Sequence, residues 1–422
     1  MTITYRPHKF QQRFHLSKAR IRGAFAGKRG GKTEAGAVES IICTEEQRGF
    51  KPNPIDPYIG VIIAPTTDML RRLSLQKFLA YSHGFYKSIN QSYHQIEWHN
   101  GSKIYGISAD KPQRLEGIKA NWIWVDEAFQ VSEQLFLEAL ARVSDTQGFI
   151  WCTGSLGTQY TNPKAHWIYK HFKEKPLADS ECFEWSTADN TYYPIEELER
   201  LKDTLDPRTY RQMFEIDWSV PGTALVYDEF DDGNIIRGYV YNPKLPTYVS
   251  IDWGWSHPMA ALFIQYDRAN DKIYVFDEIV KSKMKLETLY NQIMSKPYHI
   301  TEWICDIAGS QEREQTGISN IEFFKTKGIK FRFRTANILP TIAIVRSYIR
   351  NSKGISRLFV DENRCPKLID NLRNYSYPQK GGVITNENPI KDQDDCVDSL
   401  RYYMMNMHDS TLKENSVQMI KR

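Results

Sequence analysis

Cysteine is scarce in this chain, and its spacing excludes the sites that cysteines usually build. The chain has six cysteines in 422 residues, and no two of them form a CxxC pair. A disulfide framework needs a denser set, and a structural zinc site needs closely spaced pairs. We therefore expect neither, and this usage is typical of a protein from a reducing cytoplasm.

The chain also lacks long apolar runs, internal repeats and low-complexity segments. No stretch approaches the roughly 18 uncharged apolar residues that span a bilayer. Residues 1–14 contain Arg6, Lys9 and Arg13 but no apolar core, so they do not resemble a signal peptide. With 41% hydrophobic and 25% charged residues, the composition is typical of a soluble globular protein, and the length predicts two domains.

The net charge of +4 is small, but the basic residues are unevenly distributed. Residues 1–50 carry ten Lys or Arg and four acidic residues. Residues 321–360 carry nine Lys or Arg and one acidic residue. Such runs suit a phosphate backbone, although a solvated helix face is an equally good interpretation of any single run.

Short β-rich runs alternate with helical stretches in the first half, which predicts a parallel α/β sheet. We expect residues 1–220 to form this domain, with a small helical lid near 190–220. Residues 221–245 are rich in Pro, Gly, Asp and Asn, and are predicted to be a linker. The expected strands of the first domain are Ile21–Ala26, Tyr58–Ala64, Lys103–Ser108, Trp122–Val125 and Phe149–Thr153.

The second half begins with three expected strands joined by short turns, as in an antiparallel meander. Helices and strands alternate after it, and a last helix begins near Asp394 and ends near Met407. A second domain with a mixed sheet is therefore predicted over residues 246–408, followed by a flexible tail at 409–422. The three expected strands of the meander are Tyr248–Trp253, Met259–Tyr266 and Lys272–Ile279.

A glycine-rich loop follows the first expected strand and precedes a helix. It matches GxxxxGK[ST], with Ala26 in place of the first glycine. In such a loop backbone N–H groups cradle phosphates, Lys32 reaches the β- and γ-phosphates, and the Thr33 hydroxyl binds Mg²⁺. A site for ATP and Mg²⁺ is predicted here. The loop consists of Ala26, Gly27, Lys28, Arg29, Gly30, Gly31, Lys32 and Thr33.

Two acidic residues end the apolar strand Trp122–Val125. Asp126 is expected to hold Mg²⁺ through water, and Glu127 to polarise the water that attacks ATP. The next strand ends in Thr153, Gly154 and Ser155. A small polar strand tip at this place can sense the γ-phosphate, although a plain turn is an equally good interpretation.

Acidic residues also end strands in the second half. Asp252 and Asp306 each close an apolar strand, and Asp395 and Asp398 share one face of the last helix. Buried carboxylates repel one another unless cations hold them, and two Mg²⁺ or Mn²⁺ ions would both resolve this repulsion and clamp a phosphodiester. A two-metal nuclease site is therefore predicted.

In this order, the motifs resemble those of the large terminase subunits of tailed bacteriophages, over residues 5–407. The resemblance implies a P-loop NTPase domain followed by a ribonuclease H-like nuclease domain. It further implies that Gln11 reads adenine, with Gln12 as the near rival, and that Thr153–Ser155 couple hydrolysis to movement. It also implies that Arg142 is an arginine finger acting on a neighbouring subunit; an ordinary surface arginine is the alternative.

For the nuclease half, the resemblance implies that Asp252, Asp306 and Asp398 are metal ligands. Asp395 takes the remaining acidic position, where many relatives have His. Its implied function is ATP-driven translocation of double-stranded DNA into a procapsid, with cutting of the concatemer at the start and end of packaging. The implied partners are the small terminase subunit, the portal protein and further copies of the chain in a ring. The implied location is the cytoplasm of the infected bacterium, not the mature virion.

Two other functions fit parts of the same pattern. A helicase or repair translocase fused to a nuclease would need a second motor lobe, and roughly 65 residues between Ser155 and the linker are too few for one. An assembly protein without catalysis is disfavoured because both sets of catalytic side chains are intact.

Overall fold

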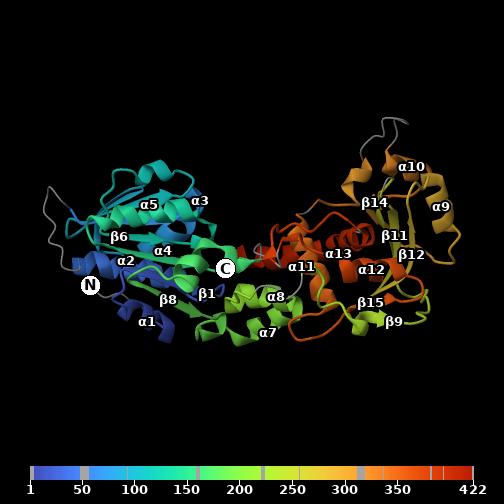
Figure 1. The fold of residues 1–422 in the computed structure, drawn as a ribbon, viewed down its shortest axis with the longest axis horizontal. Coiled ribbons are helices and arrows are strands. Elements are labelled where there is room, and N and C mark those ends of the chain that lie inside the picture. Colours follow the sequence, from blue (N-terminus) through green and yellow to red (C-terminus); the bar gives the residue numbers. More distant parts are fainter. Residues whose placement is uncertain are drawn as a thin grey trace. The chain divides into compact units, whose positions relative to one another are not determined.

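The computed structural model divides into two compact units (Figure 1). Unit 1 comprises Met1–Leu198 and Arg211–Val220, and unit 2 comprises Glu199–Tyr210 and Pro221–Arg422. Within the described residues no helix is long and apolar enough to cross a membrane. Only the backbone is described for residues 308, 310, 383 and 408–420. The described residues are 4–47, 57–92, 94–157, 162–219, 224–255, 257–310, 319–335, 337–380, 383–392 and 394–420.

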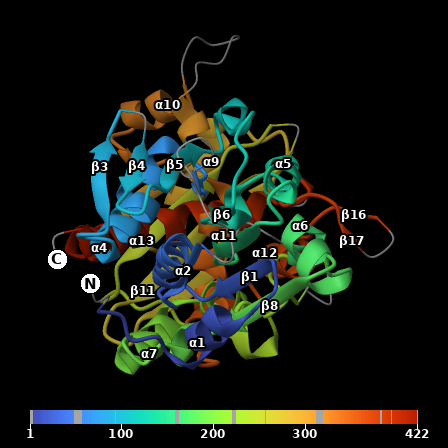
Figure 2. The same cartoon turned by 90° about the vertical axis from the view of Figure 1, so that its left-hand side faces the viewer.

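Unit 1 is built on an eight-stranded sheet with the order β3-β4-β5-β2-β6-β7-β1-β8. The strands from β5 to β8 in this order are parallel, while β3 and β4 add an antiparallel edge. Figure 2 shows β3, β4 and β5 side by side at that edge. The strands are β1 (Ile21–Ala26), β2 (Ile59–Ala64), β3 (Tyr86–Asn90), β4 (Gln95–Trp98), β5 (Lys103–Ser108), β6 (Trp122–Val125), β7 (Phe149–Gly154) and β8 (Ser180–Trp185).

Helices cover both faces of this sheet, and each face has its own hydrophobic core. The helix α2 packs so closely on β6 that a Cβ at Gly36 would lie 2.5 Å from the Trp124 ring, which explains a glycine inside a helix. The opposite face is covered by α5, through Leu135 and Phe136. The helices are α1 (Lys9–Leu16), α2 (Lys32–Glu46), α3 (Thr67–Met69), α4 (Gln76–Tyr81), α5 (Glu133–Ser144), α6 (Trp167–Tyr169), α7 (Ile195–Thr204) and α8 (Pro207–Tyr210).

Unit 2 contains a mixed seven-stranded sheet with the order β14-β13-β10-β11-β12-β15-β9. The antiparallel meander β10-β11-β12 lies at its centre, and parallel strands flank it. The strands are β9 (Ile235–Ile236), β10 (Thr247–Asp252), β11 (Met259–Asp267), β12 (Lys272–Lys281), β13 (Glu302–Cys305), β14 (Phe331–Arg332) and β15 (Leu358–Asp361), with a separate hairpin of β16 (Gln379–Lys380) and β17 (Val383–Ile384). Both sheets confirm the predicted fold class.

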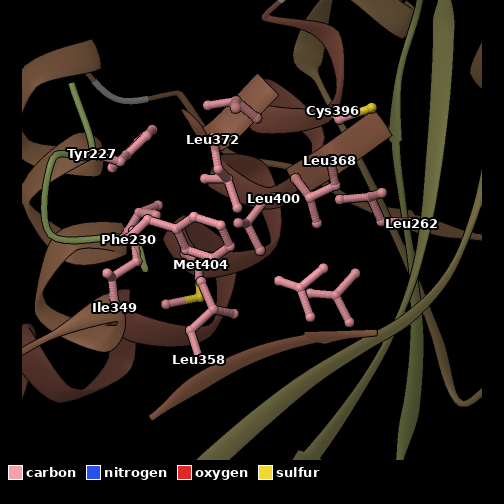
Figure 3. Close-up of a cluster of buried hydrophobic side chains, with 14 of the residues drawn as sticks. Tyr227, Phe230, Leu262, Ile349, Leu358, Leu368, Leu372, Cys396, Leu400 and Met404 are labelled. Carbon is pink, nitrogen blue, oxygen red and sulfur yellow. The ribbon is translucent and has the colours of Figure 1, made fainter. Parts of the chain in front are cut away.

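One face of the second sheet is covered by helices that share a large core (Figure 3). Leu400 and Met404 of α13 are fully buried there, and Leu368 and Leu372 of α12 point into the same cluster. This packing fixes the start of α13, where two of the predicted metal ligands lie. The helices are α9 (Leu286–Met294), α10 (Asn320–Thr326), α11 (Ile338–Ile349), α12 (Pro366–Asn374) and α13 (Asp395–Ile420).

Three features differ from the sequence-based expectation. The backbone of α13 continues to Ile420, beyond the expected helix end near Met407. The strand β9 pairs with β15 inside the stretch interpreted as a linker. Residues 199–210, interpreted as part of a lid on the first domain, belong to unit 2, where Asn351 and Ser352 donate hydrogen bonds to the carbonyls of Asp203 and Leu205.

Candidate active sites

The glycine-rich loop joins β1 to α2 at the carboxyl edge of the first sheet. Arg29 and Gly31 have positive φ angles, 64° and 79°, which turn successive N–H groups toward the same side. A Cβ at Gly27 would lie 2.2 Å from the Phe214 carbonyl oxygen, so only glycine fits this position. The loop therefore has the backbone shape that anion binding at a helix N-terminus requires.

Protein donors hold the carbonyl oxygens of this loop. Trp185 Nε1 donates to Gly30 O at 2.6 Å, and Gln11 Nε2 donates to Gly31 O at 2.7 Å. Two further donors come from the segment that follows β8: Thr187 Oγ1 to Lys28 O and Asn190 Nδ2 to Arg29 O, each at 2.6 Å. Three N–H groups of the loop also bond within the chain: Gly27 N to Trp185 O, Lys28 N to Met213 O and Gly30 N to Gly27 O. These bonds fix the loop shape, and phosphate binding would fall to the N–H groups at the start of α2 and to Lys32.

Gln11 is buried, and both ends of its amide are already bonded within the chain. Its oxygen accepts from His8 N at 3.0 Å, while its nitrogen reaches Gly31. The rival Gln12 donates to the Pro7 carbonyl. Adenine reading by Gln11 stays a prediction; in this structure the side chain supports the phosphate loop.

The acidic pair lies at the carboxyl end of β6, opposite the loop lysine. Lys32 Nζ is 3.5 Å from Glu127 Oε1. Asp126 is 1% exposed, and its two oxygens accept hydrogen bonds from Ser74 Oγ and Thr153 Oγ1, each at 2.7 Å. Burial and the neighbouring Glu127 raise the pKa of Asp126 to about 6, while the hydroxyl donors oppose this rise.

The tip of β7 connects the acidic pair to the phosphate loop. Trp124 Nε1 donates to Thr153 Oγ1 at 2.7 Å, which directs the Thr153 hydroxyl proton toward Asp126. Ser155 Oγ donates to the Ala26 carbonyl at 2.8 Å. A Cβ at Gly154 would lie 2.9 Å from the Phe129 ring, so the turn is tightly packed. Coupling by this tip to DNA movement stays a prediction.

Ser74 is a site residue that the sequence did not reveal. It lies in the π-helical segment Leu70–Leu75 between α3 and α4, and single π turns often occur at functional sites. A serine in a polar helix carries no motif, and its bond to Asp126 spans 52 residues, so only the fold brings the two together.

Arg142 lies in the last turn of α5, at the amino end of β6. Ala120 N donates to the Arg142 carbonyl at 3.0 Å, and the guanidinium pairs with Glu138 at 2.6 Å. Asp126 follows the carboxyl end of the same strand, so Arg142 does not reach the phosphate loop of its own chain. Action on a neighbouring subunit stays a prediction.

The second sheet gathers the other predicted carboxylates at one edge. Asp252 ends β10, and Asp306 follows the parallel neighbour β13. Asp395 and Asp398 begin α13, whose Ser399 is bonded to Ser250 of β10 in both directions, at 2.6 and 2.7 Å. These bonds hold the start of the helix against the strand that carries Asp252.

The carboxylates of this edge repel one another. Burial raises the pKa of Asp252 well above its usual range, and Asp398, Asp395 and Asp306 add to the rise. Burial, followed by the charge of Asp394, raises the pKa of Asp395 to about 6. Burial also raises the pKa of Asp398, although Arg401 opposes this. Such a set of oxygen donors suits Mg²⁺ or Mn²⁺.

The structure does not bring three of these side chains into ready metal-binding spacing. Within the described residues no group of three His, Cys, Asp or Glu side chains is placed to hold an ion. Arg401 instead pairs with Asp398, at 2.7 Å, and is anchored by a 3.1 Å bond to Thr341 Oγ1. The carboxylates therefore lie at one edge of the sheet without metal-binding spacing, and metal ligation by Asp252, Asp306, Asp395 and Asp398 stays a prediction.

The basic run 321–360 does not form one open stripe. Lys327 pairs with Glu287, Arg332 with Glu302 and Arg350 with Asp231, and Arg346 is only 6% exposed. The partners come from distant parts of the chain, which is why the sequence suggested an unbalanced charge. DNA binding by this run stays a prediction, and several of its cations already have carboxylate partners.

The fold and the two sites define a class of protein: a P-loop ATPase domain joined to a ribonuclease H-like domain with a nuclease-type carboxylate set. Two family descriptions match the chain, "Phage terminase large subunit" at residues 77–215 and "Terminase RNaseH-like domain" at residues 249–407. The chain therefore resembles the phage terminase large subunits in both domains, as the sequence motifs predicted.

Individual relatives agree with this family. The PBSX phage terminase large subunit of Bacillus subtilis (strain 168) is 22% identical over 324 residues, 69% of this chain and 70% of the relative. The terminase large subunit of Escherichia phage T5 is 23% identical over 335 residues, 73% of this chain and 70% of the relative. The solved large terminase of a thermophilic bacteriophage has the same fold, with 17% identity and a TM-score of 0.58, covering 94% of this chain and 98% of that one.

Proposed function

We propose that this chain is the motor and the nuclease of a phage packaging machine. ATP hydrolysis in unit 1 would drive double-stranded DNA into a procapsid, and unit 2 would cut the concatemer when packaging starts and ends. The observation that carries this proposal is the presence, in one chain that matches these two family descriptions, of both a phosphate loop facing Asp126 and Glu127 and a separate carboxylate cluster at Asp252.

In the ATPase step, the loop backbone and Lys32 would bind the phosphates, and Thr33 and Asp126 would hold Mg²⁺. Glu127 takes the proton of the attacking water, since it lies beside Lys32 and is partly exposed to solvent. The large terminase of the thermophilic bacteriophage has been solved in complex with ATP-γ-S, which supports ATP as the nucleotide for this chain. Arg142 would complete the site of a neighbouring subunit.

In the nuclease step, Asp252 would contact both of two divalent ions, because the central strand of such a sheet carries the shared ligand. Asp306 would hold one ion and Asp398 the other, with Asp395 beside it. When bound, Mg²⁺ or Mn²⁺ would supply an activated water and charge stabilisation of the leaving oxygen. Arg401 orients Asp398 and would keep its carboxylate ionised, since an adjacent guanidinium favours the charged form.

The partners follow from the family and are part of this proposal. They are double-stranded DNA, the small terminase subunit, the portal protein and neighbouring copies of the chain in a ring. The place of action would be the cytoplasm of the infected bacterium, before the virion is complete.

A paired assay tests the proposed function. The full-length chain should hydrolyse ATP faster with DNA and the portal present, and should nick or cut a plasmid in Mn²⁺ without ATP. Ca²⁺ should support binding but little cutting, because its loose coordination spoils the alignment. A preparation that binds DNA but performs neither reaction would contradict the proposal.

A further inference from the structure

A second candidate site lies beside the carboxylate cluster of unit 2. It is an open surface depression, called the cavity below, with a volume of about 550 Å³. It lies between the carboxyl end of β12, the start of β11 and the start of α12. Three of its lining residues are cationic and one is acidic. The lining residues are Pro258, Glu278, Val280, Lys281, Ser282, Asn363, Arg364, Pro366 and Lys367.

The acidic member is neutralised by the protein. Glu278 accepts hydrogen bonds from Lys367 N at 2.8 Å and Leu368 N at 2.9 Å, so its two oxygens cap the first turn of α12. A carboxylate at a helix N-terminus is balanced by the helix dipole. The lining therefore sets three cations, Lys281, Arg364 and Lys367, against one capped carboxylate. Two of these cations also have a carboxylate partner outside the lining, Asp361 at 3.8 Å from Arg364 and Asp370 at 2.8 Å from Lys367.

The cations differ in how firmly they are held. The Arg364 guanidinium donates to Tyr239 O and to Tyr298 Oη and lies over the Phe276 ring, so it is fixed at the wall. Lys367 pairs with Asp370 at 2.8 Å but remains partly exposed, and Lys281 is exposed. One rigid guanidinium with two adaptable ammonium groups is an arrangement suited to a phosphate oxygen.

The cavity and the carboxylates share one edge of the sheet. Asp252 is paired with Ala260 of β11, and Ala260 is paired with Val280 of β12, a lining residue. Two strand spacings of about 4.8 Å separate β10 from β12, roughly 10 Å in all. The hydrogen bond to Asp370 raises the pKa of Lys367, and Asp395 is close enough to add to that rise.

We propose that this cavity binds a backbone phosphate of the DNA strand that is cut in unit 2. A separation of roughly 10 Å places this phosphate within a few nucleotides of the scissile bond on the same strand. The site holds the strand in register over Asp252. This inference rests on the proposed nuclease function and adds a substrate subsite to it.

The test compares two double variants of the full-length chain. Lys281→Gln/Lys367→Gln removes two cavity cations. Lys244→Gln/Arg268→Gln removes two exposed cations at the opposite edge, before β10 and after β11. DNA binding is measured in Ca²⁺ from 50 to 200 mM salt, and plasmid cutting in Mn²⁺ at several DNA concentrations.

The cavity variant should bind DNA about tenfold more weakly at low salt, and its salt slope should fall by about 2, one for each lost phosphate contact. In cutting, KM should rise more than kcat falls. The control pair should keep the wild-type slope. Equal slopes for the two variants would overturn the proposal.

A second arm separates DNA from other phosphates. Inorganic phosphate is titrated calorimetrically into the wild type and the cavity variant. Millimolar binding that the cavity variant loses, with unchanged DNA binding, would assign the cavity to a free anion and overturn the DNA subsite. If the wild type cuts no DNA but the salt slopes still differ as expected, the nuclease proposal fails while the phosphate-binding cavity stands.

Discussion

The two acidic centres of this chain hold their carboxylates in different ways. In unit 1, Asp126 accepts two hydroxyl hydrogen bonds and Glu127 lies beside Lys32. In unit 2, the charges of Asp398, Asp395 and Asp306 all add to the rise that burial causes in the pKa of Asp252. Both centres contain carboxylates that repel one another, Asp126 and Glu127 in the first and the four aspartates in the second. In the first, two hydroxyl donors oppose the rise in the pKa of Asp126, whereas in the second the opposing donor is Arg401 on Asp398.

This difference indicates different relations to metal. A carboxylate held by two donors keeps its position whether or not an ion is present, so nucleotide binding meets a preorganised site. Carboxylates that repel one another are aligned only when cations neutralise them. We therefore expect the ATPase site to depend on side-chain geometry and the nuclease site to depend on metal for its geometry as well as its chemistry.

The largest expected effect comes from exchanging single oxygens for nitrogens at the two centres. Asp252→Asn should abolish plasmid cutting, by at least about 10³-fold, and leave ATP hydrolysis at the wild-type rate. Glu127→Gln should do the reverse, because it removes the proton acceptor but not nucleotide binding. Both rates are measured on each variant. Equal cutting by wild type and Asp252→Asn would place the nuclease centre elsewhere.

A comparable loss is expected for Arg142 if it acts on a neighbouring subunit. In the portal-assembled complex Arg142→Ala should lower ATP hydrolysis by about 10³-fold, while Glu138→Gln, which removes only its ion-pair partner, should not. Arg114 gives the sharpest comparison, because it is exposed in the turn after β5, at the phosphate-loop edge. If Arg114→Ala abolishes turnover and Arg142→Ala does not, the finger is Arg114.

The sequence predicted the parts of these centres that depend on local motifs, and it missed those that depend on contacts between distant residues. β1, β6 and β10 were predicted because each is an apolar run that ends in its own motif residue. The strand β8 was missed, since its alternating polar pattern is weak, and so was Trp185, whose indole reaches Gly30 from 155 residues away. Contacts of this length depend on strand order, which a single sequence does not encode locally.

Charge was the least predictable property. The run 321–360 contains many cations, but their carboxylate partners come from α9, β13 and the segment before β9. The cavity cations lie outside the run 321–360. A charge count along the chain measures composition, whereas a binding surface depends on which charges remain unneutralised after folding.

A smaller effect is expected from the hydroxyl groups that hold Asp126. Ser74→Ala and Thr153→Val should each slow ATP hydrolysis by roughly 10-fold, since a hydrogen bond to a charged group contributes about 1.5–3 kcal/mol. The double variant should lose less than the product of the two, because both donors hold one carboxylate. Ser144→Ala, which removes an exposed hydroxyl bonded to the Ala141 carbonyl at 2.7 Å, is the matched control. Unchanged rates would show that the Asp126 position does not need these donors.

The smallest expected effect is on stability, and it tests directly whether the carboxylates around Asp252 repel one another in the folded chain. Asp395 has its pKa raised from 3.8 to about 6, so between these values the folded chain binds protons that the unfolded chain releases. This contribution to the free energy of unfolding is present at low pH and is lost as the pH rises through about 6. At pH 7.5, therefore, Mn²⁺ or Asp252→Asn should each raise the unfolding temperature of unit 2 by roughly 2–4 °C, and Mn²⁺ should add little to Asp252→Asn.

The control is Asp267→Asn, on the β11–β12 turn. A hydrogen bond from Asn270 lowers the pKa of Asp267, so that change should lower the unfolding temperature instead. Calorimetry of the full-length chain measures all four conditions, and a lower unfolding temperature for Asp252→Asn would contradict a repulsive cluster and make the two acidic centres alike.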